Sequence, residues 1–198
     1  MPRAFDKAYY DRYYRNARTR VTSPAAIRRQ AAFLAAYLNY LELRPRSIVD
    51  VGCGTGTLLR ALGKHFPRAR LAGVEVSDYL CRHHGWLKGS VVDFHAEEEF
   101  DLVVCNDVLA YLDDAECHQA LRNLVSLTGA ALFLGVLTEE DLALCDRGRT
   151  DLSQHSRPAA WYRRRLHRNL VNVGGGLYLK RPPSVTVWSL DALTAATP

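Results

Sequence analysis

The chain has 198 residues, of which 48% are hydrophobic and 24% charged, a composition that fits one globular domain with a buried core. No stretch approaches the roughly 18 uninterrupted apolar residues of a membrane span, and no apolar signal core follows Met1. The five cysteines are an odd number without CxxC spacing, which favours free thiols in a reducing compartment. We therefore expect a cytoplasmic protein without a membrane partner.

The net charge of +5 is unevenly distributed along the chain. Residues 1–46 hold ten basic and three acidic side chains, residues 47–145 hold seven and fifteen, and residues 146–198 hold nine and three. An acidic middle is thus flanked by two basic segments. Two interpretations stay open: the flanks shape a pocket for an acidic partner, or they are an arginine-rich surface exposed to solvent.

The first 45 residues predict two helices. Aromatic residues recur every four positions between residues 4 and 15, which is helical spacing. Ser23 followed by Pro24 is a typical helix start, and the apolar face after it should cover a sheet until Pro45 ends the helix.

A strand, a glycine turn and a helix follow. Apolar residues on both sides of Asp50 predict a strand buried on both faces, and Gly52, Gly54 and Gly56 come at every second position after it. Glycines allow positive φ and let a ligand lie against bare main chain, at which the amino end of the next helix would point. Glu75, 19 residues after Gly56, ends a second strand where an acidic residue can bind ribose hydroxyls.

This combination resembles the class I S-adenosylmethionine-dependent methyltransferases: Asp50-Val-Gly-Cys-Gly-Thr-Gly matches their first motif and Glu75 its acidic partner. The resemblance implies an α/β, Rossmann-like fold with a seven-stranded sheet of order 3-2-1-4-5-7-6, whose last two strands are antiparallel. It divides one domain into a helical lid (1–45), a cofactor-binding core (46–137), a substrate-side insertion (138–168) and a β-hairpin (169–198).

The resemblance also implies where the cofactor, S-adenosyl-L-methionine, and its product S-adenosyl-L-homocysteine would bind. A third strand is expected over residues 89–94, where Asp93 would accept a hydrogen bond from adenine and Phe94 would pack on the base; the alternative for Asp93 is a turn or cap residue. A fourth strand over residues 100–105 would end in Asn106 and Asp107, facing the sulfonium. The implied cofactor-binding residues are Asp50, Gly52, Cys53, Gly54, Gly56, Glu75, Val76, Asp93, Phe94, Asn106 and Asp107.

No residue has the pattern of a strong catalytic base. The candidates are Tyr111, where many family members carry histidine; His155, in the polar segment after the fifth strand; and Tyr14, in the lid. His155 also fits an ordinary surface histidine. Cys81, His83 and His84 are close together but lack further ligands at suitable spacing, so no metal is predicted.

The end of the chain predicts a basic helix and a hairpin. Residues 157–166 read as a helix opening with proline, whose basic face could hold a carboxylate, a phosphate or a nucleic-acid backbone. Two β runs, 170–180 and 184–190, are expected to form the final hairpin, with a bulge or bend at the glycines 174–176.

The sequence thus predicts a methyltransferase acting on an oxygen, nitrogen or carbon atom of a small acidic or aromatic molecule. One alternative is an RNA or protein methyltransferase that uses the basic flanks. Another is a non-catalytic nucleotide-binding protein or an NAD-dependent enzyme. The Asn/Asp-Pro-Pro-Tyr/Phe pattern of enzymes that methylate base amino groups is missing, and the sequence leaves the oligomeric state undetermined.

Overall fold

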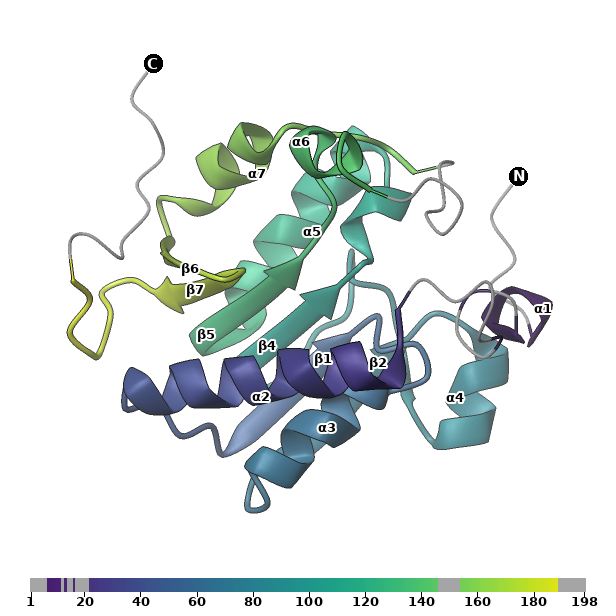
Figure 1. Cartoon of the computed structure of the whole chain (residues 1–198), viewed down its shortest axis with the longest axis horizontal. Helices are drawn as coiled ribbons and strands as arrows, with labels where there is room; N and C mark the ends of the chain where they lie inside the picture. Colours follow the sequence, from purple (N-terminus) through teal and green to yellow (C-terminus); the bar gives the residue numbers. More distant parts are fainter. Residues whose placement is uncertain (1–6, 12, 14–15, 17–21, 146–153, 189–198) are drawn as a thin grey trace.

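The computed structural model describes residues 7–11, 13, 16, 22–145 and 154–188, which form one seven-stranded sheet with helices on both faces (Figure 1). The strands are β1 (Ser47–Val51), β2 (Arg70–Glu75), β3 (Leu87–Lys88), β4 (Phe100–Asn106), β5 (Thr128–Gly135), β6 (Leu170–Gly174) and β7 (Leu177–Lys180). The helices are α1 (Lys7–Tyr10), α2 (Pro24–Tyr40), α3 (Thr57–His65), α4 (Asp78–His84), α5 (Asp114–Leu127), α6 (Glu139–Leu142) and α7 (Ala159–Leu166), with a 3-10 helix at Leu109–Tyr111.

The strand order is β3-β2-β1-β4-β5-β7-β6. Neighbouring strands from β3 to β5 are parallel, whereas β7 runs antiparallel to both β5 and β6. The predicted order and the antiparallel pair at the end are confirmed. Because β1, β2, β4 and β5 point the same way, their carboxyl ends lie along one edge of the sheet, where α/β folds bind ligands.

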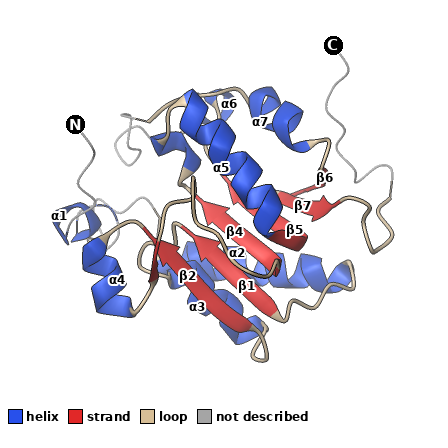
Figure 2. Ribbon diagram, turned by 180° about the vertical axis from the view of Figure 1, so that it is seen from behind, coloured by secondary structure: helices blue, strands red, loops and turns tan. Residues whose placement is uncertain are grey.

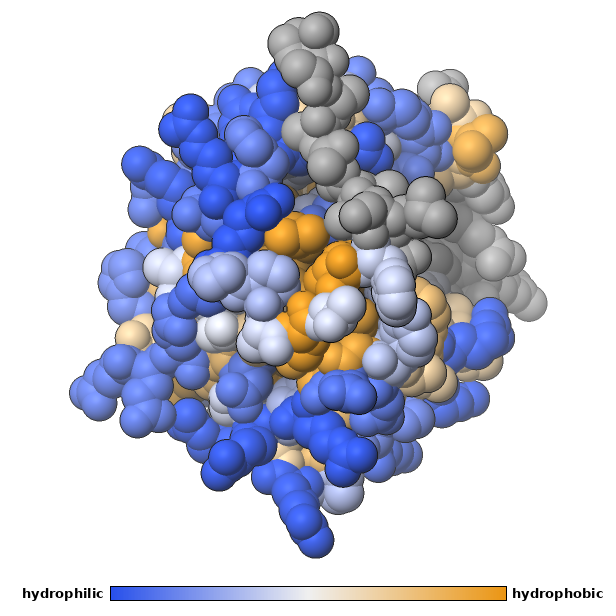
Figure 3. Space-filling view, turned by 90° about the vertical axis from the view of Figure 1, so that its left-hand side faces the viewer, coloured by the Kyte–Doolittle hydropathy of each residue, from blue (hydrophilic) through white to orange (hydrophobic). Residues whose placement is uncertain are grey.

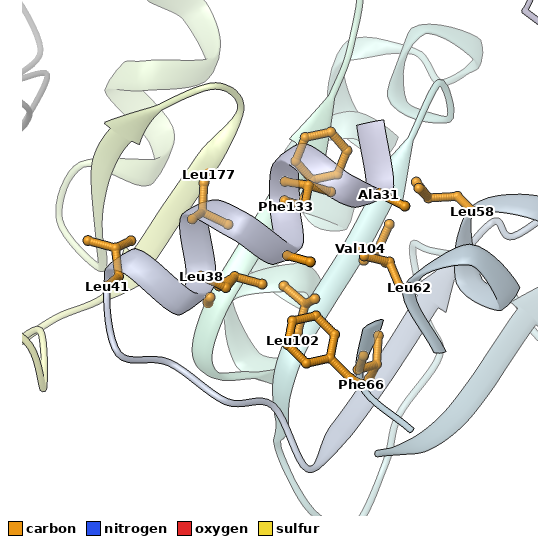
Figure 4. Packing of buried hydrophobic residues seen from close by; sticks show 14 of the residues in the cluster. Ala31, Leu38, Leu41, Leu58, Leu62, Phe66, Leu102, Val104, Phe133 and Leu177 are labelled. Atoms are coloured by element: carbon orange, nitrogen blue, oxygen red, sulfur yellow. The ribbon is translucent and has the colours of Figure 1, made fainter. Parts of the chain in front are cut away.

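Two helical layers bury the sheet. Helices α2 and α3 cover the face that is in front in Figure 1, and α5 lies across the opposite face, in front in Figure 2. Figure 4 shows side chains of α2, α3, β4, β5 and β7 meeting in the first layer, among them Leu38, Leu62, Leu102, Phe133 and Leu177. The second cluster joins α5 and α7 to the other face of the sheet.

Helix α2 begins as predicted. The Ser23 hydroxyl accepts the Ala26 N–H at 3.1 Å, and Pro24 occupies the first turn. Its apolar face is buried, but the helix ends at Tyr40, five residues before the proline expected to stop it. Glu42, just beyond the helix, has a positive φ of 59°, so the chain leaves the helical conformation before Pro45.

The third strand was predicted in the wrong place. It is β3, Leu87–Lys88, which pairs with the last two residues of β2. Residues 89–94 form turns instead, because the Ser90 hydroxyl accepts the Val92 N–H at 3.2 Å and the Ser90 carbonyl accepts the Phe94 N–H at 2.8 Å. Short polar side chains of this kind compete with strand pairing for backbone groups.

The final hairpin was also placed wrongly. Both of its strands, β6 and β7, lie within residues 170–180, and Gly174, Gly175 and Gly176 have φ values of 93°, 58° and 77°. Three successive residues with positive φ reverse the chain where the sequence suggested a bend within one strand. Residues 184–188 are not a strand, although Val185 and Val187 pack against the first core layer.

The face at the left of Figure 1 is hydrophilic around its rim, with hydrophobic residues gathered near its centre (Figure 3). Most buried hydrophobic residues lie in the two clusters on either side of the sheet.

Within the described parts of the chain, no helix combines the length and the apolar character needed to cross a bilayer.

Candidate active site

The turn after β1 has the geometry that its glycines predict. Gly52, Gly54 and Gly56 have φ values of 81°, 53° and 67°, and Gly56 is the residue that precedes α3. The Val74 carbonyl of β2 accepts the N–H groups of Gly52 at 2.8 Å and Cys53 at 3.0 Å. The turn is therefore fixed against the neighbouring strand, and the amino end of α3 opens at the carboxyl edge of the sheet.

Glycine is also required at two of these positions, because neighbouring side chains lie too close for a Cβ atom. A Cβ atom at Gly52 would lie 2.4 Å from Cγ2 of Val108, and one at Gly56 would lie 2.2 Å from the Trp86 ring. Trp86 covers the turn, because its indole N–H donates to the Gly54 carbonyl at 3.1 Å. Sequence reasoning missed Trp86. Its only signal in the sequence is its position between Gly85, which caps α4, and the edge strand β3.

Glu75 lies at the end of β2 and is 3% exposed. Its Oε2 accepts the Gly54 N–H at 2.8 Å, and its Oε1 accepts the N–H groups of Val76 at 2.8 Å and Ser77 at 2.9 Å. The predicted acidic residue and the predicted glycine turn are thus in direct contact. Val76 itself is 41% exposed.

Asp50 adds a second buried carboxyl to the same edge. It is 3% exposed in β1, and burial, reinforced by the negative charge of Glu75, raises its pKa to about 7. Burial also raises the pKa of the neighbouring Cys53 thiol, with Asp50 and Glu75 adding to the effect, so Cys53 is a neutral packing residue.

Helix α1 contacts this edge through Tyr10. Tyr10 is 3% exposed, its ring lies beside Gly54, and its hydroxyl donates to Glu75 Oε1 at 3.5 Å. The hydroxyl of Tyr9 lies 3.0 Å from that of Tyr111. Sequence reasoning missed Tyr10, because the spacing of four residues predicted one aromatic face of the helix, which includes Tyr9. In the structure the adjacent Tyr9 and Tyr10 both make contacts. Tyr14 lies outside the described residues.

The residues that follow β4 lie beside the glycine turn, since β4 pairs with β1. Asp107 has a positive φ of 57°, and its N–H donates to the Gly135 carbonyl at 2.8 Å. The Asn106 amide donates to Asp107 Oδ2 at 2.9 Å and accepts from the Gln30 amide at 3.2 Å. Burial raises the pKa of Asp107, an effect that the Asn106 hydrogen bond opposes.

Two of the predicted catalytic candidates lie on segments that contact each other through the backbone. Tyr111 ends the short 3-10 helix after β4, and the His155 backbone N–H donates to the carbonyl of the preceding residue, Ala110, at 2.8 Å. The His155 side chain is exposed and that of Tyr111 is half-buried. The segment after β5 therefore folds back onto the end of β4.

Asp93 lies in the turn that replaces the predicted strand. It is exposed, and its Oδ1 accepts the Ser90 N–H at 3.3 Å, which matches the alternative of a turn residue. Phe94 is half-buried and lies beside Gly89. Their contacts with adenine stay a prediction.

Cys81 and His83, which were considered as metal ligands, make other contacts in the structure. The Cys81 thiol donates to the Glu75 carbonyl at 3.2 Å, and the His83 ring stacks on Tyr79 with centroids 5.9 Å apart. The described residues contain no cluster of three or more histidine, cysteine, aspartate or glutamate side chains that could hold a metal ion.

Comparison with known proteins identifies the segment that contains this site. A family model described as a methyltransferase domain matches residues 49–130, from β1 to the start of β5. This segment therefore resembles the methyltransferase domain family. With the sheet order described above, this match confirms the resemblance to class I methyltransferases.

Individual relatives agree with that assignment. The methyltransferase domain is similar to malonyl-[acyl-carrier protein] O-methyltransferase of Hahella chejuensis, with 32% identity over 108 residues, 50% of this chain and 39% of the relative. The chain thus spans about two fifths of that relative's length.

Solved structures show the same fold over more of the chain. The magnesium protoporphyrin IX methyltransferase of Synechocystis, with bound S-adenosylhomocysteine, gives a TM-score of 0.62 at 17% identity and covers 89% of this chain and 93% of its own. The N-methyltransferase NodS of Bradyrhizobium japonicum, also with S-adenosylhomocysteine, gives 0.58 at 18% identity, with 77% and 86% covered.

Proposed function

We propose that the protein is an S-adenosylmethionine-dependent methyltransferase that methylates an oxygen, nitrogen or carbon atom of a small acidic or aromatic molecule. The observation that carries this proposal is the contact between Gly54 and Glu75, which joins bare main chain to a buried carboxylate at the carboxyl edge of the sheet. Both residues lie in the segment matched by the methyltransferase model. The similar proteins named above, an O-methyltransferase and an N-methyltransferase, leave the attacked atom open.

The residues of this edge fit the cofactor. The positive-φ turn and the first N–H groups of α3 suit its amino-acid end, and Glu75 suits the ribose hydroxyls. A cation nearby would favour the ionised forms of the buried Asp50 and Asp107 carboxyls, whose pKa values burial raises. When bound, S-adenosylmethionine supplies a methyl group on a positively charged sulfur. Asp93 and Phe94 are proposed to contact its adenine, and Val76 to lie in the cofactor site, by family resemblance alone.

The protein's own part in the reaction would be to orient the acceptor and exclude water. Tyr111 and Tyr9 present two hydroxyls 3.0 Å apart, and Asn106 and Gln30 present amides at the end of β4. These groups would hydrogen-bond the nucleophile of the acceptor without deprotonating it. When the transferred group is already activated, orientation of the two reactants alone supplies much of the acceleration. His155 would be a base only for an acceptor that reaches the surface.

A pocket of about 510 Å³ is a candidate for the rest of the acceptor. It opens at the same edge, between the end of β5, α6, α7 and the β6–β7 turn, and its lining includes Thr138, Glu140, Arg163, Asn172 and Tyr178. Much of this lining belongs to residues 138–168, which supports the proposed substrate-side insertion. The mixed charges suit a polar molecule that presents both donors and acceptors.

The nucleic-acid alternative has less support. Of the four arginines between residues 157 and 165, Arg157 is buried, and Arg165 lies over the Trp161 ring with its guanidinium carbon 3.4 Å from the centroid. These two cations therefore make intramolecular contacts. Only Arg163 and Arg164 of this group are exposed.

Calorimetry and a transfer screen test the proposal. S-adenosylhomocysteine should bind the purified chain while NAD does not, and heat from NAD but not from S-adenosylhomocysteine would favour the alternative of an NAD-dependent enzyme. Labelled methyl from S-adenosylmethionine should appear in a panel of benzoic acids, catechols, amino sugars and dicarboxylic acids. Label in total RNA instead, lost steeply as salt rises, would overturn the small-molecule assignment.

A further inference from the structure

Arg157 is a buried arginine that joins separate parts of the chain. Its side chain is 3% exposed, and its Nε donates to the Asp114 carboxylate at 2.7 Å. Its Nη1 and Nη2 donate to the carbonyls of Leu109 at 3.4 Å and Leu112 at 2.7 Å. The guanidinium also lies 5.0 Å from the centroid of the Trp161 ring. A buried cation is stable only when its donors are hydrogen-bonded. These hydrogen bonds therefore fix the loop that carries Leu109 and Leu112.

The two carbonyls bracket Tyr111, which lies between Leu109 and Leu112 in the sequence. His155, two residues before Arg157, donates its backbone N–H to the carbonyl beside Tyr111, that of Ala110. The Arg157 side chain therefore holds the loop that carries Tyr111. The Ala110 carbonyl of the same loop holds the backbone of His155.

The other end of this loop touches the cofactor turn. The Val108 side chain occupies the space where Gly52 would carry a Cβ atom, 2.4 Å from that position. The Asp107 N–H is held by the Gly135 carbonyl. Residues 106–112 thus run from the glycine turn at one end to Arg157 at the other.

We propose that Arg157 is a positioning residue for methyl transfer, holding Tyr111 and His155 at the edge where the acceptor meets the cofactor. This inference rests on the proposed function. Arg157 does not bind an anionic acceptor itself, because it is buried and its Nε, Nη1 and Nη2 all have intramolecular partners. Lysine cannot replace it, since a single ammonium group cannot reach three acceptors with the same fork geometry.

The test compares Arg157→Ala and Arg157→Lys with Arg164→Ala, an exposed arginine of α7. Amide exchange is measured by mass spectrometry over residues 106–112 and 48–56, together with the affinity for S-adenosylhomocysteine. In both Arg157 variants we expect exchange in 106–112 to rise about tenfold or more, since charge-assisted hydrogen bonds are lost. Exchange in 48–56 and the affinity should change less than about threefold.

Turnover and chemical rescue separate positioning from a merely structural role. With the panel acceptor that the unmodified chain methylates, kcat should fall about tenfold while KM for S-adenosylmethionine stays the same. Guanidinium at about 20 mM, far below denaturing concentrations, should slow exchange in Arg157→Ala and not in Arg164→Ala.

Exchange in residues 106–112 that stays unchanged in Arg157→Ala would overturn the inference. So would an equal rise in 48–56 with a matching loss of affinity, because it would mean general destabilisation. Exchange and rescue need neither cofactor nor acceptor, so failure of the unmodified chain to bind S-adenosylhomocysteine would refute the proposed function and leave the placement of the loop by Arg157 to be decided separately.

Discussion

The Gly54 N–H donates to the Glu75 carboxylate at 2.8 Å, although the two residues are 21 positions apart in the sequence. The same carboxylate accepts the N–H groups of the two residues that follow it. Glu75 is therefore part of the architecture of the glycine turn as well as a candidate cofactor ligand. Its two roles can be separated by choosing the substitution.

Glu75→Gln retains one side-chain oxygen to accept N–H groups but removes the negative charge. We expect the affinity for S-adenosylhomocysteine to fall about tenfold to a hundredfold, as charge-assisted hydrogen bonds to hydroxyls are lost. Glu75→Ala should bind as weakly and also lower the free energy of unfolding by about 1–3 kcal/mol, because buried N–H groups lose their acceptor. Calorimetry and urea unfolding measure the two effects, and wild-type affinity in Glu75→Gln would remove the ribose assignment.

Gly52→Ala should damage both the turn and the binding site. The new Cβ would lie 2.4 Å from Val108 Cγ2, in a backbone conformation that alanine rarely adopts. Gly85→Ala is the matched control, because Gly85 also has a positive φ, 72°, but no atom within 4 Å of the added Cβ.

We expect Gly52→Ala to lower the free energy of unfolding by about 1–3 kcal/mol more than Gly85→Ala does. It should also weaken S-adenosylhomocysteine binding more than about tenfold. Shortening the neighbour, in Gly52→Ala with Val108→Ala, should recover part of the stability. Equal losses in the two single variants would show that backbone strain alone, and not the close approach of Val108, constrains the turn.

Asp50 makes the stability of the fold depend on pH. Its pKa of about 7 in the folded state lies above the 3.8 of an unperturbed aspartate, so the folded chain holds a proton that the unfolded chain has released between these values. The contribution of Asp50 to stability is thus fully present below about pH 4 and decreases as pH rises to about 7.

Asp50→Asn stays neutral throughout and should therefore gain stability relative to the unmodified chain as pH rises from about 4 to 7, by up to about 4 kcal/mol. Urea unfolding at several pH values measures this difference. A difference for Asp50→Asn that does not vary with pH would mean that the carboxyl is ionised in the folded chain.

The Tyr9–Tyr111 hydroxyl contact attaches α1 to the 3-10 helix that follows β4. In a double-mutant cycle, Tyr9→Phe and Tyr111→Phe should show a coupling of about 0.5–1.5 kcal/mol in the free energy of unfolding. Tyr9→Phe combined with Tyr37→Phe should be additive, because the Tyr37 hydroxyl donates to Val173 elsewhere in the fold. Additivity in the first pair would show that α1 does not depend on this contact.

The glycine turn and its acidic partner could be predicted because their signals are local, whereas the sheet order came from the resemblance to class I methyltransferases. An apolar run, alternating glycines and an acidic residue one strand later determine a turn whose φ values follow directly from glycine chemistry. The direct contact between Gly54 and Glu75 then follows from the parallel pairing of β1 and β2.

The errors arose where short polar residues or consecutive glycines compete with strand pairing. Ser90 turns the chain within residues 89–94, and the glycines 174–176 reverse it within one apparent strand. Arg157, Tyr10 and Trp86 could not be predicted, because their partners are distant in sequence and the residues themselves carry no local pattern. The roles of the predicted site residues, and the four-part division of the chain, stay predictions.

Titration calorimetry of the purified chain with S-adenosylhomocysteine, repeated with Glu75→Gln and with NAD, tests the central claim most directly. We predict saturable heat with one molecule of S-adenosylhomocysteine per chain, a loss of about tenfold or more in affinity in Glu75→Gln, and no heat with NAD. Absence of heat with S-adenosylhomocysteine from a folded sample, at concentrations up to about 1 mM, would contradict the account.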